Sequence, residues 1–308
     1  KTGYLIGDGR GDLNQNHEYF AVEACEYRRH FLAYYPEVAI MTNFEIDHVD
    51  YFKDDADYLS AYRDFAQNVK EKIIVWGDDP HFDQLDLPID KVWTYGFNET
   101  NDIYVKNVVK ETNRTRFDLY FNQEFVKTFD LPLVGDHMIL NAMAVIGVGI
   151  YEKTPLENVE LGLQNFSGAL RRYVVKEVGD SVIIDDYAHH PTEIKVTLEA
   201  TKTRFPNRKI VAIFKPHRVG RVYYFAKEFK EALEIADEVG LCPFTSIDDH
   251  EEGIDIDITF LQDMIKGAFI VEDKVEDIQK LAAFKPAVYV FMSSKNIYDL
   301  EAALEKLL

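Results

Sequence analysis

Short apolar runs alternate with polar, helix-like stretches through the first 80 residues. Four runs, YLIGD, YFAVEA, VAIMTN and KIIVWG, lie at residues 4–8, 19–24, 38–43 and 72–77. Runs of this length and composition are typical of buried strands. Between the last two, apolar residues recur at helical spacing behind an acidic first turn, at positions 58, 61, 62, 65 and 69. The pattern predicts the buried strands of an α/β sheet with a helix packed on it.

The sequence pattern changes between residues 92 and 133, where runs of β-branched and aromatic residues are separated by Asn and Glu. Runs such as VWTYGF, IYVKNVV, RFDLYF and EFVKTF are typical of antiparallel hairpins, so we expect a meander after the parallel strands. Two helices should follow, one in HMILNAMAVIGVGIY and one beginning near Thr154-Pro155.

The helical pattern ends near Asn165–Gly168 and a new strand pattern begins after it. We therefore expect a domain boundary there, with domains at residues 1–167 and 168–308. The second domain opens with a hairpin turning at Gly179-Asp180. Strands at 209–214, 238–242, 268–271 and 287–291 then alternate with periodic helical stretches such as 225–236 and 297–307. This alternation predicts a small doubly wound, Rossmann-like domain.

Charge and composition exclude several classes of partner and location. The 308 residues carry a formal charge of −20, which disfavours nucleic acid and anionic membranes as partners. Hydrophobic residues make up 47% of the chain, as in folded proteins, and no apolar run reaches the roughly 18 residues of a membrane span. The cysteines, Cys25 and Cys242, cannot make a disulfide framework, and no signal-peptide pattern is present. These features predict a cytoplasmic location.

Candidate chemistry comes directly after the predicted strands, because ligands of open α/β sheets gather at the carboxyl ends of strands. Glu23 ends the second run, and the Asp47-His48 pair follows the third. A carboxylate and an imidazole from adjacent strand ends could share a divalent cation. Taken alone, His48 is better explained as a capping or surface histidine.

Three further segments in the second half concentrate polar groups. DDYAHHP at 185–191 puts two carboxylates, a tyrosine and two histidines on one loop, which is dense for a structural loop. FKPHRVGR at 214–221 supplies hydrogen-bond donors for a carboxylate or phosphate. The alternative is a solvent-exposed basic turn with no binding role. GALRRY at 168–173 brings two arginines to the domain boundary, where a cleft is expected but where plain surface charge is common.

A phosphate loop of the form G-x-x-x-x-G-K-[ST] is absent from the 308 residues. GDGRGD at 7–12 is rich in glycine but has no Lys followed by Ser or Thr. We therefore expect its glycines to serve a turn rather than a nucleotide.

Taken in order, these segments resemble the Mur ligases of peptidoglycan synthesis. The resemblance rests on EACEYRRHFLAYYPEVAIMTNFEIDHVDYF at 23–52, then GDHMILNA, ALRRY, DDYAHHPTE and the F-x-PHR-x-x-R motif. It covers the whole chain but begins partway into the family's central ATPase domain, without the phosphate loop or the N-terminal uridine-nucleotide domain. It implies a partial central domain, mostly a parallel sheet with an antiparallel meander, followed by an amino-acid-binding domain.

The resemblance is strongest to the branch of the family that joins L-alanine to UDP-N-acetylmuramate. ATP first phosphorylates the muramoyl carboxylate, and the amine of the amino acid then attacks the acyl phosphate. Phosphoryl transfer of this kind needs Mg²⁺ and cationic side chains around mutually repelling oxygens. The implied ligands are ATP, Mg²⁺, UDP-N-acetylmuramate and L-alanine, and the fragment alone is expected to be inactive without the phosphate loop.

The resemblance also implies roles for individual residues. Glu23 and His48 would be magnesium ligands and, with Arg172 and Asp186, catalytic. Arg172 and Asp186 would also contact the ATP, together with His137 and Asn141. The amino acid and acyl acceptor would be bound by Tyr187, His189, His217, Arg218 and Arg221. No lysine lies between Lys53 and Lys70, so we expect none of the carbamylated lysine that some relatives carry on this helix.

Several positions depart from the family pattern. Met138 replaces the first Asn of an H-N-x-x-N motif, and a methionine cannot make amide contacts. Lys215 stands in place of a Gln, Val219-Gly220 replaces an aromatic and a hydroxyl residue, and Ser293–Asn296 replaces a Gly-Ala-Gly-Asp turn. Two alternatives to the L-alanine ligase therefore stay open: a non-catalytic binding protein, and a relative that takes another amino acid or a preformed peptide. The sequence does not determine the oligomeric state.

Overall fold

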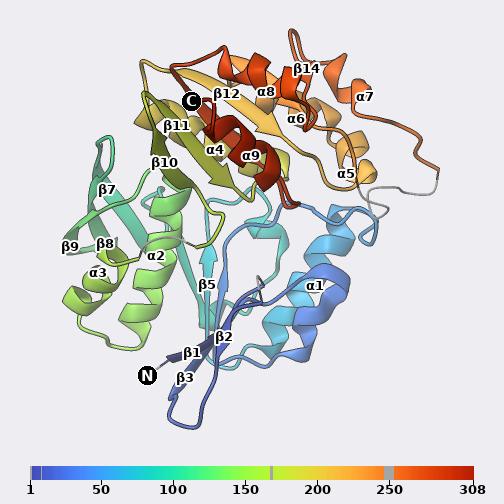
Figure 1. Ribbon diagram of the computed structural model, residues 1–308. Helices are drawn as coiled ribbons and strands as arrows, with labels where there is room; N and C mark the ends of the chain where they lie inside the picture. Colours follow the sequence, from blue (N-terminus) through green and yellow to red (C-terminus); the bar gives the residue numbers. More distant parts are fainter. Residues whose placement is uncertain (1, 8, 167–168, 246–252) are drawn as a thin grey trace. The chain divides into compact units, whose positions relative to one another are not determined.

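The computed structural model describes residues 2–7, 9–166, 169–245 and 253–308 (Figure 1). The chain forms two compact units, Lys1–Tyr104 and Val105–Leu308. The predicted domain boundary falls on residues 167 and 168, which lie outside the described residues. It therefore stays a prediction.

The first unit contains parallel strands joined by a helix, as its apolar pattern predicts. β4 (Val38–Met41), β5 (Lys72–Trp76) and β6 (Val92–Gly96) pair in that order, and β6 pairs in parallel with the start of β7 (Ile103–Lys110). α1 (Asp55–Asn68) begins where the side chain of Asp54 accepts the backbone N–H of Asp57. The prediction that β6 belongs to an antiparallel meander is wrong, because β6 pairs in parallel with β5 and with β7.

The two earliest apolar runs are strands, but the prediction that they are buried is wrong. β1 (Thr2–Leu5) pairs in parallel with β3 (Tyr19–Val22) and antiparallel with β2 (Gly11–Asp12), which makes a separate three-stranded sheet. Both sides of β1 are thus occupied, and the side chains of Tyr4, Leu5, Tyr19 and Phe20 are exposed. Composition identified the strands without revealing their partners.

The glycine-rich segment before β2 is a turn, as predicted. The backbone of Gly9 has a φ of +87°, and its N–H donates to the carbonyl of Ile6. Asp8, in the same segment, lies outside the described residues. Three short 3₁₀ segments complete this unit, at Tyr27–Ala33, Phe82–Gln84 and Ile89–Lys91.

The second unit begins with the remainder of β7, which lies beside β8 (Thr115–Phe121). β8 and β9 (Glu124–Leu131) form the predicted antiparallel hairpin. Its two loop residues, Asn122 and Gln123, both have positive φ, as the favoured two-residue hairpin turn requires. α2 (Asp136–Tyr151) and α3 (Leu156–Gln164) follow and pack on each other, with Gly149 of α2 against Val159 of α3.

The rest of the second unit is a six-stranded sheet in the order β10-β11-β15-β12-β13-β14. The hairpin of β10 (Val174–Val178) and β11 (Ser181–Asp186) is antiparallel, and the other pairs are parallel. The remaining strands are β12 (Lys209–Phe214), β13 (Glu238–Leu241), β14 (Phe269–Ile270) and β15 (Ala287–Met292). The last strand in the chain therefore lies at the centre of the sheet, between β11 and β12.

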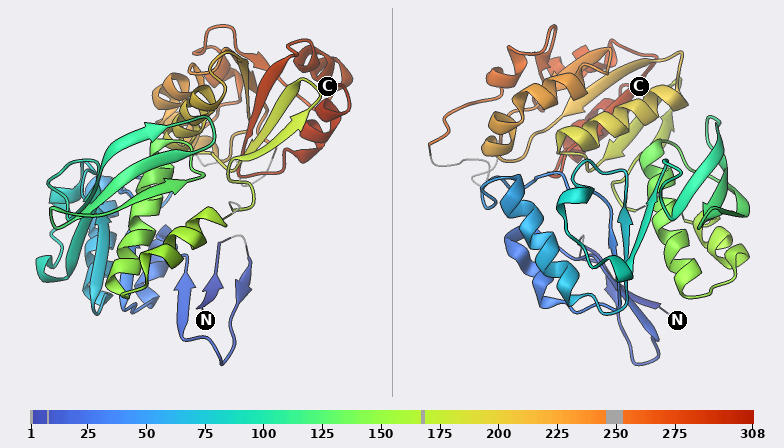
Figure 2. Two further views of the ribbon diagram at one scale, coloured as in Figure 1. Left: turned by 90° about the vertical axis from the view of Figure 1, so that its left-hand side faces the viewer. Right: turned by 180° about the vertical axis from the view of Figure 1, so that it is seen from behind.

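Helices cover both faces of this sheet (Figure 2, left). Alternate strand residues divide between two buried clusters: Ile184, for example, faces one and Ile183 the other. The first cluster is closed by α4 (Pro191–Arg204), α5 (Val219–Tyr224), α6 (Ala226–Leu233) and α7 (Thr259–Gln262), and the second by α8 (Val275–Ala282) and α9 (Tyr298–Glu305). This confirms the doubly wound fold. Within the described ranges, no helix has the length and apolar character needed to cross a membrane.

Candidate active site

Chemistry-bearing residues of the second unit gather at the carboxyl ends of β11, β15 and β12. These three strands are neighbours in the sheet, although β15 follows β12 by more than 70 residues in the sequence. The chain leaves β11 toward α4 on one face and leaves β15 toward α9 on the other, which makes a topological switch point. Ligands of doubly wound folds bind at such points.

Asp186, the last residue of β11, is held by the backbone. Its Oδ2 accepts the N–H of Tyr173 at 2.8 Å, and its Oδ1 accepts the N–H of Ala188 at 2.7 Å. Burial raises the pKa of this carboxyl to about 6, against these two hydrogen bonds and the charge of Arg172, which lower it. Asp186 is therefore a firmly placed carboxylate that titrates close to neutral pH.

Tyr187 lies between two arginines. The guanidinium carbons of Arg171 and Arg172 are 5.2 Å and 5.1 Å from the centroid of its ring. The backbone N–H of Tyr187 donates to the carbonyl of Arg171 at 2.6 Å. The pair predicted from GALRRY thus reaches the loop after β11, and the cation–π contacts fix the plane of the tyrosine ring.

The two arginines differ in exposure. The side chain of Arg172 is 49% exposed and ion-pairs with Glu193 at 3.3 Å. Arg171 is half-buried: its Nη2 donates to the carbonyls of Ser293 at 2.6 Å and Lys295 at 3.1 Å, and its Nε is 3.8 Å from Asp185. Arg171 therefore fastens the turn after β15 to the start of the domain, and Arg172 is the arginine available to a ligand.

Glu193, in the first turn of α4, organises the loop between β11 and that helix. Its Oε2 accepts the backbone N–H groups of His189 at 2.9 Å and His190 at 3.2 Å. The same oxygen is 3.1 Å from Nδ1 of His189. Burial opposes ionisation of Glu193, but the hydrogen bond and charge of His189 and the charge of Arg172 outweigh it and hold the pKa well below its usual range.

The loop after β12 meets the turn after β15. Nδ1 of His217 lies 3.0 Å from Oγ of Ser294, and Oγ of Ser293 donates to the carbonyl of Lys215 at 2.9 Å. Arg221 is buried, and its Nη1 donates to the carbonyl of His217 at 3.3 Å. Arg218 is half-buried with a φ of +67°. The Ser293–Asn296 turn, which departs from the family pattern, is therefore part of this site.

The predicted ATP-contacting pair lies on the first turns of α2. His137 is half-buried and Asn141 exposed. Burial lowers the pKa of His137, so its ring is held neutral near neutral pH. Gly135, just before the helix, has a φ of +93°, and a Cβ there would lie 2.8 Å from the His137 ring and 3.3 Å from Ala200 of α4. Only glycine fits this close approach without strain.

Glu23 and His48, the predicted magnesium ligands, lie in the first unit after β3 and β4. Glu23 is exposed, and its Oε2 accepts the N–H of Gly7 at 2.8 Å. Nε2 of His48 is 3.3 Å from Glu26 Oε1 and 3.9 Å from Asp47 Oδ2, whereas its buried Nδ1 has no hydrogen-bond partner in the described part of the chain. Among the described residues, no three His, Cys, Asp or Glu side chains are grouped closely enough to hold a metal ion.

The donor chemistry at these two residues still fits Mg²⁺. Mg²⁺ commonly takes one or two protein carboxylates and fills its other positions with water and phosphate oxygens. Glu23 offers a carboxylate open to solvent, and His48 offers an imidazole with an unpartnered buried nitrogen. Glu23 and His48 follow strands of two different sheets, and their assignment to one ion stays a prediction.

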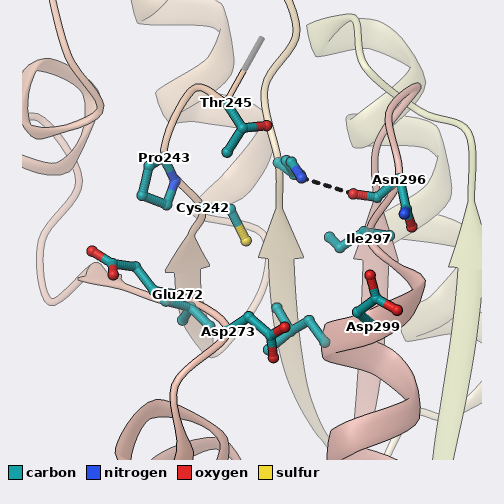
Figure 3. A pocket seen from close by; sticks show the side chains of 11 residues that line it. Cys242, Pro243, Thr245, Glu272, Asp273, Asn296, Ile297 and Asp299 are labelled. Atoms are coloured by element: carbon teal, nitrogen blue, oxygen red, sulfur yellow. Dashed lines mark hydrogen bonds between the residues drawn. The ribbon is translucent and has the colours of Figure 1, made fainter.

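A cavity of about 430 Å³ adjoins the turn after β15 at the ends of β12 and β13, on the face covered by α9 (Figure 3). Lys215 donates to the carbonyl of Asn296 at 2.8 Å on its wall. Cys242 points into it, but burial raises the pKa of that thiol to about 12, so it is a poor nucleophile. Asp273 and Asp299 also line the cavity.

Two residues of this site were not identified from the sequence. Glu193 could have been found as an acidic residue three positions after the helix-capping position, where it caps backbone N–H groups. Glu26, whose Oε1 lies 3.3 Å from Nε2 of His48, gave no such signal, because it directly precedes a 3₁₀ segment and no periodicity places its side chain.

Comparison with known proteins identifies both halves of the chain. Residues 11–149 match the Mur ligase middle domain, and residues 171–296 match the Mur ligase glutamate ligase domain. The chain belongs to the Mur ligase family. The resemblance inferred from the ordered motifs is thereby confirmed.

Solved structures of Mur ligases share the fold. The UDP-N-acetylmuramate–alanine ligase MurC of Thermotoga maritima is 24% identical with a TM-score of 0.73, over 99% of this chain and 67% of that one. MurF of Acinetobacter baumannii is 17% identical with a TM-score of 0.78, over 98% and 70% of the two chains. The MurF ligase of T. maritima, solved in complex with ADP, is 18% identical with a TM-score of 0.75, over 99% and 74%.

Proposed function

We propose that this chain is part of an ATP-dependent ligase that joins L-alanine to UDP-N-acetylmuramate through an acyl phosphate. Its membership of the Mur ligase family supports a ligase of peptidoglycan synthesis. The observation that carries the finer proposal is the cluster at the switch point, where Arg172, His189 and His217 gather around one edge of a doubly wound sheet. Cationic donors of this kind suit a carboxylate and phosphate oxygens.

The roles that we propose for individual residues are those that the family resemblance implies. Glu23 and His48 would hold Mg²⁺, which would screen the phosphate oxygens when bound. Arg172, which is exposed, would contact the ATP phosphates, Asp186 would lie near the nucleotide, and His137 and Asn141 would lie near the adenine. The remaining proposed contacts, to the amino acid and acyl acceptor, come from Tyr187, His189, His217, Arg218 and Arg221. We also keep the cytoplasm as the proposed location.

The reaction makes two demands that these side chains meet. The muramoyl carboxylate must approach ATP although both are negative, and Arg172, together with Mg²⁺ when it is bound, would reduce that repulsion. The amino acid must then be oriented toward the acyl carbon, and a guanidinium can grip its carboxylate with paired hydrogen bonds. Ser294 Oγ, 3.0 Å from Nδ1 of His217, adds a hydroxyl to this part of the site.

Phosphate release from ATP by the full-length protein tests the proposal. The assay contains UDP-N-acetylmuramate with L-alanine, glycine or L-serine, each with and without Mg²⁺. We expect release that needs both L-alanine and Mg²⁺. Phosphate release with only glycine or only L-serine would mean that this amino acid, and not L-alanine, is the substrate. No phosphate release with any of the three, despite nucleotide binding, would support the non-catalytic alternative.

The metal assignment has its own variants. Glu23→Ala and His48→Ala should each abolish magnesium-dependent turnover, whereas Glu71→Ala, an exposed glutamate of the same unit, should not. Undiminished turnover in either of the first two variants would contradict the assignment of that residue.

A further inference from the structure

We propose that Glu193 and His189 form a proton-accepting pair, in which Glu193 positions the imidazole and His189 takes, at Nε2, the proton that the incoming amino acid must lose. The inference rests on the proposed function and assigns its second chemical step. Glu193 acts through His189 and is a positioning residue.

The first argument is the orientation of the imidazole. Nδ1 of His189 lies 2.9 Å from the carbonyl oxygen of Tyr187 and 3.1 Å from Oε2 of Glu193. A carbonyl and a carboxylate can only accept, so Nδ1 must carry a hydrogen. In the neutral ring the lone pair is therefore on Nε2, the nitrogen that can receive a proton.

The second argument is that the ring is fixed while Nε2 stays available. The backbone N–H of His189 also donates to Glu193 at 2.9 Å, and the edge of its ring packs on Tyr187 with centroids 5.2 Å apart. The side chain of His189 is 17% exposed, and within the described parts of the chain no hydrogen bond or ion pair engages Nε2. The free nitrogen is thus held at the surface of the site.

The third argument is the state of Glu193. Its two oxygens contact different partners: Oε2 lies beside Nδ1 of His189, and Oε1 lies 3.3 Å from Nη1 of Arg172. The carboxylate stays ionised through the reaction because its partners favour the charged form. An ionised carboxylate on Nδ1 stabilises the imidazolium that forms when Nε2 is protonated, as in the carboxylate–histidine pairs of hydrolases.

The step can be written with its bonds balanced. The ammonium group of the amino acid gives one proton to Nε2 of His189, and the freed electron pair forms the bond from nitrogen to the acyl carbon. The tetrahedral intermediate then collapses, the bond from carbon to the phosphate oxygen breaks, and phosphate leaves with that electron pair. The second proton of the new amide nitrogen is lost to solvent.

A comparison of two nucleophiles tests the inference in the full-length protein. L-Alanine is protonated at neutral pH and needs a base, whereas hydroxylamine is largely unprotonated and traps an acyl phosphate as a hydroxamate without one. In Glu193→Gln and His189→Gln we expect kcat with L-alanine to fall by about 100-fold or more, as for loss of a general base. Hydroxamate formation should stay within about threefold of wild type, because the first step is intact.

The outcomes separate the two proposals. Equal loss with both nucleophiles would mean that the variants damage folding or the first step, and unchanged rates with L-alanine would remove the pair from the mechanism; either overturns the inference. Glu199→Gln, an exposed glutamate on the same helix, is the matched control and should behave as wild type. A wild-type protein that forms no hydroxamate contradicts the proposed function itself.

A spectroscopic measurement decides the geometry even without turnover. In the chain labelled with ¹⁵N-histidine at alkaline pH, His189→Gln identifies the ring signals of His189. We expect a protonated Nδ1 with a slowly exchanging hydrogen and an unprotonated Nε2, and loss of the slow exchange in Glu193→Gln. A hydrogen on Nε2 in the wild-type protein would overturn the inference.

Discussion

The two groups of predicted site residues are held in contrasting ways. At the switch point of the second unit, Asp186 is buried and accepts two backbone N–H groups, and Arg171 donates to two carbonyls of the turn after β15. In the first unit, Glu23 is exposed and accepts the backbone N–H of Gly7, and the buried Nδ1 of His48 has no hydrogen-bond partner among the described residues. The first group is built into the fold, whereas the second leaves donor atoms unsatisfied.

This contrast follows from what each group is proposed to bind. Side chains that orient an amino acid and an acyl group gain from being fixed in advance, because less freedom is lost when the substrates bind. Metal ligands must keep electron pairs free, and their partners arrive with the metal. The contrast predicts that substitutions at the switch point change stability, whereas those at the metal pair leave stability nearly unchanged.

The largest effect is expected for Arg171→Ala. The change removes the bonds to Ser293 and Lys295 and leaves the buried carboxylate of Asp185 without its cation. Loss of one partner of a buried pair costs about 3–5 kcal/mol, so urea unfolding should show a free energy of unfolding lower by about that amount. Arg116→Ala, on the exposed side of β8, should change it by less than about 0.5 kcal/mol. A loss below about 1 kcal/mol at Arg171 would show that the turn is held by other contacts.

A pH-dependent effect is expected from Asp186→Asn. The pKa of Asp186 is raised to about 6 in the folded protein, above the usual value of about 3.9 for an unfolded chain. The folded state therefore binds more protons between these values, and the contribution of Asp186 to stability falls as the pH rises through them. The wild-type free energy of unfolding minus that of the variant should fall by about 2–3 kcal/mol from pH 4 to pH 7. A difference that is flat, or that rises over this range, would contradict the raised pKa.

The smallest effect is expected for Glu23→Ala. The side chain is exposed and, within the described ranges, accepts one hydrogen bond, from Gly7, so its loss should lower the free energy of unfolding by no more than about 1 kcal/mol. Urea unfolding of the isolated chain without Mg²⁺ measures this directly. A loss comparable to that of Arg171→Ala would make Glu23 a structural residue and would remove the contrast between the two groups.

Local patterns in the sequence predicted most of the elements. The helical spacing behind Asp54 gave α1, the hairpin at Gly179 was correct, and the alternation after it gave the doubly wound sheet. The patterns failed where pairing is non-local. The run at Tyr19–Val22 is a strand, but its apolar side chains are exposed because it pairs with β1 in a small separate sheet.

The sequence predicted individual residues of the candidate site but not the contacts between them. Strand ends and loop composition pointed to Asp186, His189 and His217. Ser294 contacts His217 because β15 lies between β11 and β12 in the sheet. No local sequence pattern encodes this strand order. Glu193 was missed because its main signal is a helix-capping position, and its contact with His189 appears only once the loop is folded.

The central claim is that the residues at the switch point and the metal pair serve a reaction through an acyl phosphate. The most direct measurement uses UDP-N-acetylmuramate labelled with ¹⁸O in its carboxylate, incubated with the full-length protein, ATP, Mg²⁺ and L-alanine. The account predicts that the released phosphate carries one ¹⁸O, because the labelled oxygen bridges carbon and phosphorus and leaves with the phosphate. Unlabelled phosphate released without ligated product would mean that ATP is hydrolysed by water, and it would contradict the account.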